Sequence, residues 1–346
     1  MLSTRATVFL TQTPFGDPPS STRGMAPRLR AQYEAGSRQP FAIVDNPRDA
    51  SLIVYCEDYQ ASEHPYAPKL RAESSVAGFP ENVFVISSED RPIGFLPGIY
   101  VSMPRSRFDD RRFRSGAYFG DINPLIVKAE HERTGISPRW LFSFIGAPTD
   151  PMRIALLKMY RTTPKWFIQE TGNAQYNIGV DDPAKKQGQQ LYLQTLLESQ
   201  FVLCPRGYGT SSFRLFETMR LGRVPVIISD EWVPPLGPAW SDFSIRIAER
   251  SIVDLPHLLA PRAPDAAEMG RLARQEWERW FSPSVYASRC LEWIHDLHLA
   301  RTHDERAQHA RWPEMIRDAE QRIHGGGRLK RLTRRLRSLR GAPPRA

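Results

Sequence analysis

Short, continuous apolar runs recur along the chain and constrain its fold more than any other feature. In the first half they are rich in Val, Ile and Phe, and they occupy residues 7–12, 41–46, 51–58 and 82–90. An apolar run without polar alternation predicts a strand buried on both faces, as in a parallel sheet. Weaker helical patterns lie between these runs, at residues 22–36 and 64–78.

The second half repeats the alternation of strand and helix. Residues 140–146 and 165–169 are strand-like, and Asp150 followed by Pro151 predicts the start of a helix. Residues 190–199 have an amphipathic helical pattern, and residues 243–249 are strand-like. Strands that alternate with helices form mostly parallel sheets. We therefore expect two Rossmann-like α/β domains facing a cleft, with ligands beyond the carboxyl ends of the strands.

The domain boundaries follow from this alternation and from the charge. We expect an N-terminal Rossmann-like domain over 1–138, a second over 139–300, a C-terminal helix over 301–324 and a basic tail over 325–346. The formal net charge is +9, and the tail holds eight Lys or Arg and no acid, so 9 − 8 leaves +1 for the rest. A nearly neutral body makes nucleic acid an unlikely partner.

The tail combines its basic residues with a leucine stripe. Leu329, Leu332, Leu336 and Leu339 recur at helical spacing after the glycines at 325–327. A basic amphipathic helix of this kind suits an anionic membrane surface. RNA contact and a disordered arm remain alternatives.

The start of the chain and its cysteines indicate a compartment. The N-terminus lacks the charged and apolar regions of a signal peptide, and no apolar run approaches the roughly 18 residues of a membrane span. Cys56, Cys204 and Cys290 are widely spaced and lack a zinc-binding pattern. We expect three free structural thiols in a reducing compartment.

The segment 201–232 carries the strongest site signal. It reads as a strand, a glycine-containing loop, a helix and a second strand. Gly207 and Gly209 permit close backbone approach, while Ser211 and Ser212 are favourable helix N-cap residues. The free N–H groups and dipole of such a helix start form an anion site.

Charged side chains at this helix start add a possible specificity. Arg206 and Arg214 would give paired N–H contacts to a phosphate or diphosphate. Glu217 lies on the same helix face as Arg214, where its carboxylate would accept two vicinal hydroxyls of a ribose. The alternatives are a βα loop without a nucleotide and an ordinary surface ion pair between Arg214 and Glu217. The loop matches neither the Gly-Lys-Ser/Thr phosphate loop nor G-x-G-x-x-G.

The run 204–249 closely resembles the exostosin-like glycosyltransferases, glycosyltransferase family 47. The shared features are a Pro-Arg-Gly loop, Ser followed by Phe-Arg-x-Phe-Glu, then Gly-x-x-Pro-Val-Ile and Trp-Ser-x-Phe-Ser. They keep their order over about 45 residues. A weaker resemblance extends to residues 83–100 and 141–153.

The resemblance implies a GT-B-like fold and sugar transfer from a nucleotide-diphosphate donor to a glycan or lipid-linked glycan acceptor, generally with inversion. The acceptor would lie in the N-terminal domain and the donor in the C-terminal one. By match to the motif, Arg206 and the loop 207–212 bind the diphosphate with Arg214 nearby, and Glu217 takes the ribose. Arg153 is a further candidate contact to the diphosphate.

The resemblance also bears on the cellular setting. Animal members of this family usually carry an N-terminal membrane anchor, which this sequence lacks. A cytoplasmic enzyme, peripheral on the inner face of the membrane, is therefore expected.

A metal-independent reaction is expected, with no cofactor. Metal-dependent sugar transferases commonly use Asp-x-Asp, and no two aspartates in this chain are two positions apart. Arginines and the helix dipole would stabilise the departing diphosphate instead. We expect activity in EDTA.

An inverting transfer needs a general base from the first domain. Asp90 is the first candidate because it follows a strong strand, and Glu89 and Asp58 come next; any of these acids could instead cap a following helix. Asp230 and Glu231 are candidate contacts to the donor sugar, although a simple turn is the alternative. On the same fold, a non-catalytic nucleotide-sugar or glycan-binding protein is the alternative to an enzyme.

Overall fold

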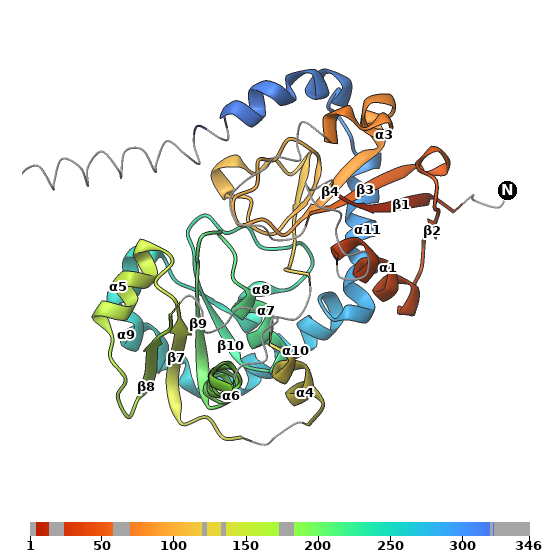
Figure 1. Cartoon of the computed structure of the whole chain (residues 1–346). Coiled ribbons are helices and arrows are strands. Elements are labelled where there is room, and N and C mark those ends of the chain that lie inside the picture. Colours follow the sequence, from red (N-terminus) through yellow and green to blue (C-terminus); the bar gives the residue numbers. More distant parts are fainter. Residues whose placement is uncertain are drawn as a thin grey trace, which may run out of the picture.

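The chain forms two parallel β-sheets, each with helices on both faces (Figure 1). The structure, a computed structural model, describes residues 5–13, 24–57, 70–119, 123–132, 136–172, 183–318 and 321. The candidate base Asp58 and the basic tail 325–346 lie outside these ranges. Two Rossmann-like domains, as the alternating pattern predicts, are confirmed.

The first sheet has six strands in the order β2-β1-β3-β4-β5-β6, all paired in parallel. Its strands are β1 (Thr7–Gln12), β2 (Ala42–Ile43), β3 (Leu52–Glu57), β4 (Val83–Ser87), β5 (Gly98–Tyr100) and β6 (Phe113–Ser115). Its helices are α1 (Met25–Ala35) and α3 (Ser74–Gly78), whereas the following helix α4 (Pro124–Glu132) packs on the second domain. A helix over residues 305–318 packs on this domain through the buried Trp312 and Ile316.

The second sheet has five strands in the order β11-β10-β9-β7-β8, again all parallel. Its strands are β7 (Trp140–Gly146), β8 (Trp166–Glu170), β9 (Ser199–Pro205), β10 (Val224–Ile228) and β11 (Ile245–Arg246). The helices of this half are α5 (Pro151–Met159), α6 (Pro183–Leu197), α7 (Phe213–Arg220), α8 (Trp240–Phe243), α9 (Leu255–Leu259), α10 (Ala266–Trp280) and α11 (Pro283–Leu299).

Strand β9 shows why continuous apolar runs fit this architecture. Phe201 and Leu203 belong to the core that includes α5 and α9, whereas Val202 and Cys204 belong to the core that includes α6 and α7. Three of these side chains are 0% exposed and Cys204 is 3% exposed. Because both faces of the strand are covered, polar alternation would bury unsatisfied groups.

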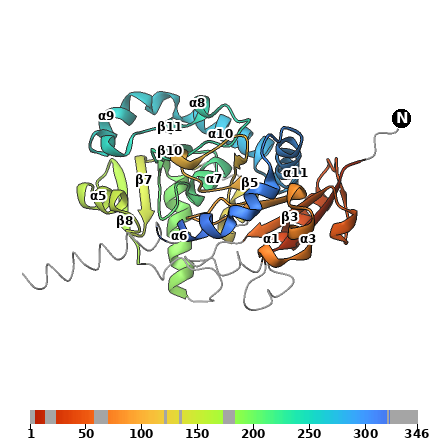
Figure 2. The ribbon, with the colours of Figure 1, turned by 90° about the horizontal axis from the view of Figure 1, so that it is seen from above.

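Helix α11 joins the two domains, which the expected boundary at residue 300 did not foresee. It follows α10 of the second domain but packs on α1 and β5 of the first. Figures 1 and 2 show it beside the first sheet. One apolar cluster accordingly runs from Val8 and Leu29 of the first domain, through Tyr286, to Leu215 of the second. The two domains therefore share a core.

Three local differences from the sequence predictions have simple causes. The strand expected over 243–249 is reduced to β11, because Trp240–Phe243 form a helical turn instead. Strand β6 was not predicted, since it is three residues long and lies among arginines and aspartates. Helix α4 was not predicted either. Short elements of this kind are specified by long-range pairing, which local pattern does not report.

The prediction of three free thiols is confirmed, because Cys56, Cys204 and Cys290 are buried and free. Burial raises the pKa of both the Cys204 and the Cys290 thiols to about 12, so neither is reactive. Within the described ranges, every helix is too short or too polar to cross a bilayer.

Candidate functional site

The loops after β7 and β9 face each other at the point where the strand order of the second sheet reverses. The chain passes from β7 to β8 on one side and then returns to β9 on the other. A Cβ atom at Gly207 would lie 3.2 Å from Nη2 of Arg153 and 3.3 Å from Oγ1 of Thr149, which belongs to the opposite loop. Such a switch point is where open α/β sheets bind ligands.

Arg214 lies buried in the first turn of α7. Its side chain is only 8% exposed, and its Nη2 donates to the carbonyl oxygen of Ile145. Its guanidinium carbon lies 4.7 Å from the ring centroid of Phe144. Among the described residues, its Nε and Nη1 have no hydrogen-bond partner. A buried guanidinium with two open donors is an incomplete site that an anion would complete.

Arg153 of α5 brings a second positive charge to the same place. Its Nε donates to the carbonyl oxygen of Arg206 at 2.8 Å, and its Nη2 donates to that of Pro205 at 3.0 Å. Burial, together with the neighbouring charge of Arg214, lowers the pKa of Arg153 to about 10. The group remains charged at neutral pH, so two like charges are held together beside the glycine loop.

Three buried hydroxyls surround these cations. Thr149 Oγ1, Thr210 Oγ1 and Ser211 Oγ all lack hydrogen-bond partners within the described part of the chain. Ser212 occupies the N-cap position of α7 but makes no side-chain cap bond there. The prediction of Ser212 as the N-cap residue is therefore correct in position, although its side chain does not cap the helix. Together these donors suit a ligand rich in acceptor oxygens.

Glu217 sits one turn further along α7 and faces a pocket. Tyr192 of α6 donates to its Oε2 at 2.6 Å. Burial, together with the adjacent Glu217 carboxylate, raises the pKa of Tyr192 well above its ordinary value, so this phenol remains a neutral donor. Arg214 and Glu217 do not form an ordinary surface ion pair, because Arg214 is buried.

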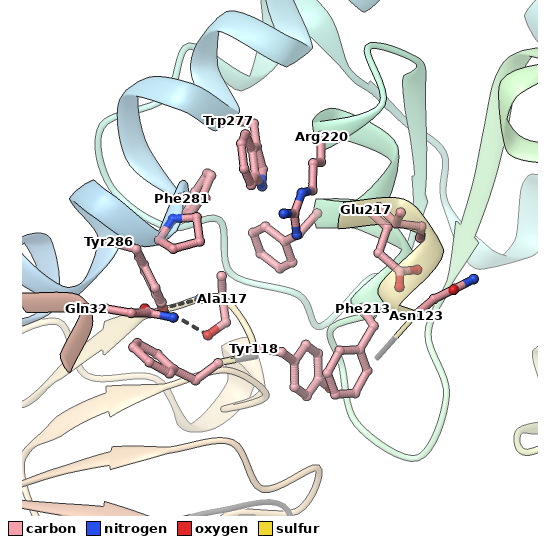
Figure 3. A pocket seen from close by; sticks show the side chains of 14 residues that line it. Gln32, Ala117, Tyr118, Asn123, Phe213, Glu217, Arg220, Trp277, Phe281 and Tyr286 are labelled. Atoms are coloured by element: carbon pink, nitrogen blue, oxygen red, sulfur yellow. Dashed lines mark hydrogen bonds between the residues drawn. The ribbon is translucent and has the colours of Figure 1, made fainter. Parts of the chain in front are cut away.

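The pocket lies between the two domains and is largely aromatic. It encloses about 660 Å³ with its open mouth included. Figure 3 shows Glu217 and Arg220 on one wall and Trp277 across from them, with Tyr118 against Phe213 at the edge. The loop after β6, α1, α4, α7 and the α10–α11 corner all contribute to it.

Arg206 is held differently from the other two arginines. Its Nη2 pairs with Asp150 at 3.1 Å, and its Nε pairs with Glu249 at 2.9 Å. Its guanidinium is thus engaged by two carboxylates, and its expected contact with a diphosphate stays a prediction. Its backbone carbonyl, in contrast, helps to fix Arg153.

Asp230 and Glu231 follow β10 and make structural contacts. The Asp230 carboxylate accepts from the Glu249 backbone N–H at 3.1 Å. The Glu231 carboxylate accepts from both the N–H and the hydroxyl of Ser106 in the first domain, at 2.9 and 2.7 Å. Glu231 therefore fastens one domain to the other, and the expected contacts of both acids with a donor sugar stay untested.

Asp90 lies across the cleft, against the tip of the glycine loop. A Cβ atom at Gly209 would lie 2.6 Å from its Oδ1, and Tyr118 donates to that oxygen at 2.7 Å. Burial raises the pKa of Asp90 above its ordinary value, although Tyr118 and the charge of Arg153 act against this. Glu89, the second candidate, is also buried, at 4% exposed.

Sequence reasoning missed Thr149, Tyr192, Ser102 and Tyr118. None of these residues belongs to a local motif, because each reaches the site from a different loop or helix. A polar residue directly after a strand was a usable signal for Ser102, which follows β5. Nothing local indicated Tyr192. As for metal, no group of three or more His, Cys, Asp or Glu able to hold an ion occurs in the described ranges.

The fold and this site define a two-domain Rossmann-like protein with two arginines held together at the switch point of its second sheet. Residues 98–261, just under half of the chain, match the family described as the Exostosin GT47 domain. This match confirms the resemblance to exostosin-like glycosyltransferases, and the two parallel sheets confirm the two Rossmann-like domains.

Individual relatives match over a shorter stretch. The Exostosin-1 homolog of Caenorhabditis elegans is 37% identical over 93 residues, which are 25% of this chain and 24% of the relative. The probable glucuronosyltransferase GUT1 of Oryza sativa subsp. japonica is 33% identical over 89 residues, 25% of this chain and 20% of that protein. The matched stretches thus span a quarter or less of these relatives.

Among solved structures, the chain is similar to WaaG, a glycosyltransferase of lipopolysaccharide biosynthesis. The two are 13% identical with a TM-score of 0.37, over 83% of this chain and 99% of that one. A score this low carries no argument about function.

Proposed function

We propose that this protein is a glycosyltransferase that moves a sugar from a nucleotide-diphosphate donor to a glycan or lipid-linked glycan acceptor. The observation that carries the proposal is Arg214, whose two open donors lie buried beside Arg153 at the start of α7. The match of residues 98–261 to the Exostosin GT47 family supports the same reaction class. Relatives named as glucuronosyl- and xylosyltransferases make a hexosyl or pentosyl group the expected cargo.

The two arginines would bind the diphosphate, which leaves with negative charge. Positive charge already in place stabilises that developing charge without reorganisation in the transition state. The N–H groups of the α7 start and the hydroxyls of Thr149, Thr210 and Ser211 would add donors to the same oxygens. This charge stabilisation is the reason for proposing a metal-independent reaction.

Glu217 would accept the vicinal hydroxyls of the ribose. It lies on the same helix as Arg214, one turn away, and Tyr192 fixes its carboxylate. The spacing suits a ribose joined to the diphosphate, since the two groups are neighbours in a nucleotide.

Asp90 would remove the proton from the acceptor hydroxyl. It belongs to the domain opposite the arginines and touches the loop that would hold the leaving group. An inverting displacement needs the base and the leaving group on opposite sides of the reacting carbon, so the donor sugar would have to lie between Asp90 and the two arginines.

Membrane association through residues 325–346 and a position on the inner face of the membrane remain part of the proposal. A lipid-linked acceptor would lie at the same surface. Deletion of 325–346 should move the protein from the membrane fraction to the soluble fraction, and unchanged fractionation would refute that part alone.

A panel of UDP- and GDP-linked sugars tests the proposal. The purified protein is incubated with each donor in water, and release of UDP or GDP is followed. We expect slow hydrolysis of one donor and faster release when a glycan acceptor is added. Tight nucleotide binding with no release from any donor, even with acceptors present, would favour the non-catalytic binding protein instead.

A further inference from the structure

A chain of three hydrogen bonds crosses the cleft from the start of α7 to Asp90. The backbone N–H of Ser211 donates to Oγ of Ser102 at 3.4 Å. Oγ of Ser102 lies 3.2 Å from the hydroxyl of Tyr118, which donates to Oδ1 of Asp90 at 2.7 Å. Ser102 and Tyr118 are both buried. The chain therefore connects a loop of the second domain to a carboxyl group of the first.

The direction of each bond follows from the chemistry of the groups. An ionised carboxylate only accepts, so the single proton of Tyr118 is committed to Asp90. The oxygen of Tyr118 is then the acceptor for the proton of Ser102, and Ser102 accepts from the N–H of Ser211. All three donors point the same way, which strengthens each bond in turn.

Gly209 lets this chain form. A Cβ atom at that position would lie 2.4 Å from Oγ of Ser102 and 2.6 Å from Oδ1 of Asp90, closer than any real contact. The glycine of the donor loop thus packs directly on two members of the chain. This close packing fixes the position of the loop relative to the carboxyl group.

The ring of Tyr118 is held by the second domain as well. It stacks on Phe213, the first residue of α7, with ring centroids 3.7 Å apart and an interplanar angle of 20°. The two rings lie together at the edge of the pocket in Figure 3. A residue of the first domain is thereby oriented by the helix that carries Arg214 and Glu217.

We propose that Ser102 and Tyr118 are positioning residues that align Asp90 with the donor loop, through a hydrogen-bond chain that spans the two domains. The proposal rests on the proposed function in one respect, the role of Asp90 as the base. Neither residue need touch substrate. Their effect is to orient one carboxylate and to set how strongly it holds a proton.

The test replaces Tyr118→Phe, which keeps the stacked ring and removes the hydroxyl. With the UDP- or GDP-sugar that the panel identifies and water as acceptor, we expect kcat to fall about 10-fold with KM for the donor changed less than about 2-fold. The hydroxyl lowers the pKa of Asp90, so its loss should move the acid limb of the pH–rate profile to higher pH. Ser102→Ala should act in the same direction and less strongly.

Tyr160→Phe is the matched control. It also removes a phenol hydroxyl, one that donates to the carbonyl oxygens of Ile252 and Val253 away from the cleft. We expect a wild-type kcat and a wild-type acid limb. Wild-type kcat and an unmoved limb in Tyr118→Phe would overturn the proposal.

A second measurement needs no donor. In protein labelled with ¹³C at the aspartate carboxyls, the Asp90 signal is assigned by its absence in Asp90→Asn, and its pKa is read by titration. Tyr118→Phe should raise that pKa, and an unchanged value would overturn the positioning role. If Asp90→Asn instead turns over normally, the base assignment fails and the hydrogen-bond result stands apart from it.

Discussion

The carboxyl edges of the two sheets bring different charged groups to the cleft. At this edge the first sheet has Glu57 and Glu89, which are buried, and Asp90, which faces the cleft. The second places Arg153 and Arg214 at the corresponding edge. The two domains share one architecture, but their charged side chains differ at the carboxyl edge of the sheet, where such folds bind ligands. The difference indicates a division of work, with proton removal on one side and a departing anion on the other.

The proposed base of the first domain can be removed by the substitution Asp90→Asn. Asp90→Asn keeps the shape of the side chain and removes the base, so we expect turnover of donor and acceptor to fall about 10²- to 10⁴-fold. Nucleotide affinity should not change, because the cations are untouched. Asp110→Asn, an exposed acid of the same domain, is the control, and it should turn over at the wild-type rate. Full activity in Asp90→Asn would transfer the role to Glu89 or Asp58.

In the second domain, the contribution of ribose binding can be measured separately from that of diphosphate binding. Glu217→Gln should weaken UDP or GDP binding about 10-fold, since a charged acceptor for two hydroxyls is lost. Pyrophosphate, which has no ribose, should bind as it does to the wild type. Calorimetric titration with both ligands gives the comparison, and Glu268→Gln on the outer surface of α10 is the control. Equal losses for both ligands would mean that Glu217 acts through the fold rather than on the ribose.

The raised pKa of Asp90 predicts a stability effect whose sign can be derived. The folded protein holds this proton more tightly than the unfolded chain, so the group favours folding at low pH and loses that contribution as pH rises through its folded pKa. At neutral pH this largely desolvated carboxylate opposes folding. Asp90→Asn cannot ionise, so it should melt at a higher temperature than wild type at pH 7, and the two should converge towards pH 4. A variant less stable at neutral pH would contradict the assignment of burial as the cause.

Removal of divalent metal ions is expected to have no effect on turnover. If arginines and the helix start stabilise the leaving group, excess EDTA should leave turnover unchanged. The measurement is the rate of UDP or GDP release with and without the chelator. Complete loss, restored by manganese or magnesium, would show that the cationic edge is not sufficient.

The parts of the site that local rules govern were predictable from the sequence. Asp150 accepts from the N–H of Met152 as an N-cap, and Pro151 follows at the first helical position. Gly222 ends the α7 segment with a φ of +67°, a conformation that few other residues adopt. The helix, and with it the positions of Arg214 and Glu217, follows from such turn chemistry.

The parts that were not predictable depend on partners distant in the sequence. The ion pair of Arg206 with Glu249 was not visible in the sequence, because Glu249 is far along the chain. The hydrogen bonds of Glu231 to Ser106 were not visible either, because Ser106 belongs to the other domain. The packing of α11 on the first sheet, and the approach of Tyr118 to Asp90, arise in the same way. Sequence spacing predicts which residues share one face of a helix or strand. The residues that pack against that face are known only from the folded structure.

The central claim is that Arg214, through its open donors, holds the diphosphate. Calorimetric titration of UDP or GDP, whichever binds more tightly, into wild type, Arg214→Ala and Arg206→Ala tests it directly. We expect affinity to fall about 10- to 100-fold in Arg214→Ala and less than about 3-fold in Arg206→Ala, whose guanidinium is engaged by Asp150 and Glu249. Wild-type affinity in a folded Arg214→Ala variant would contradict the account.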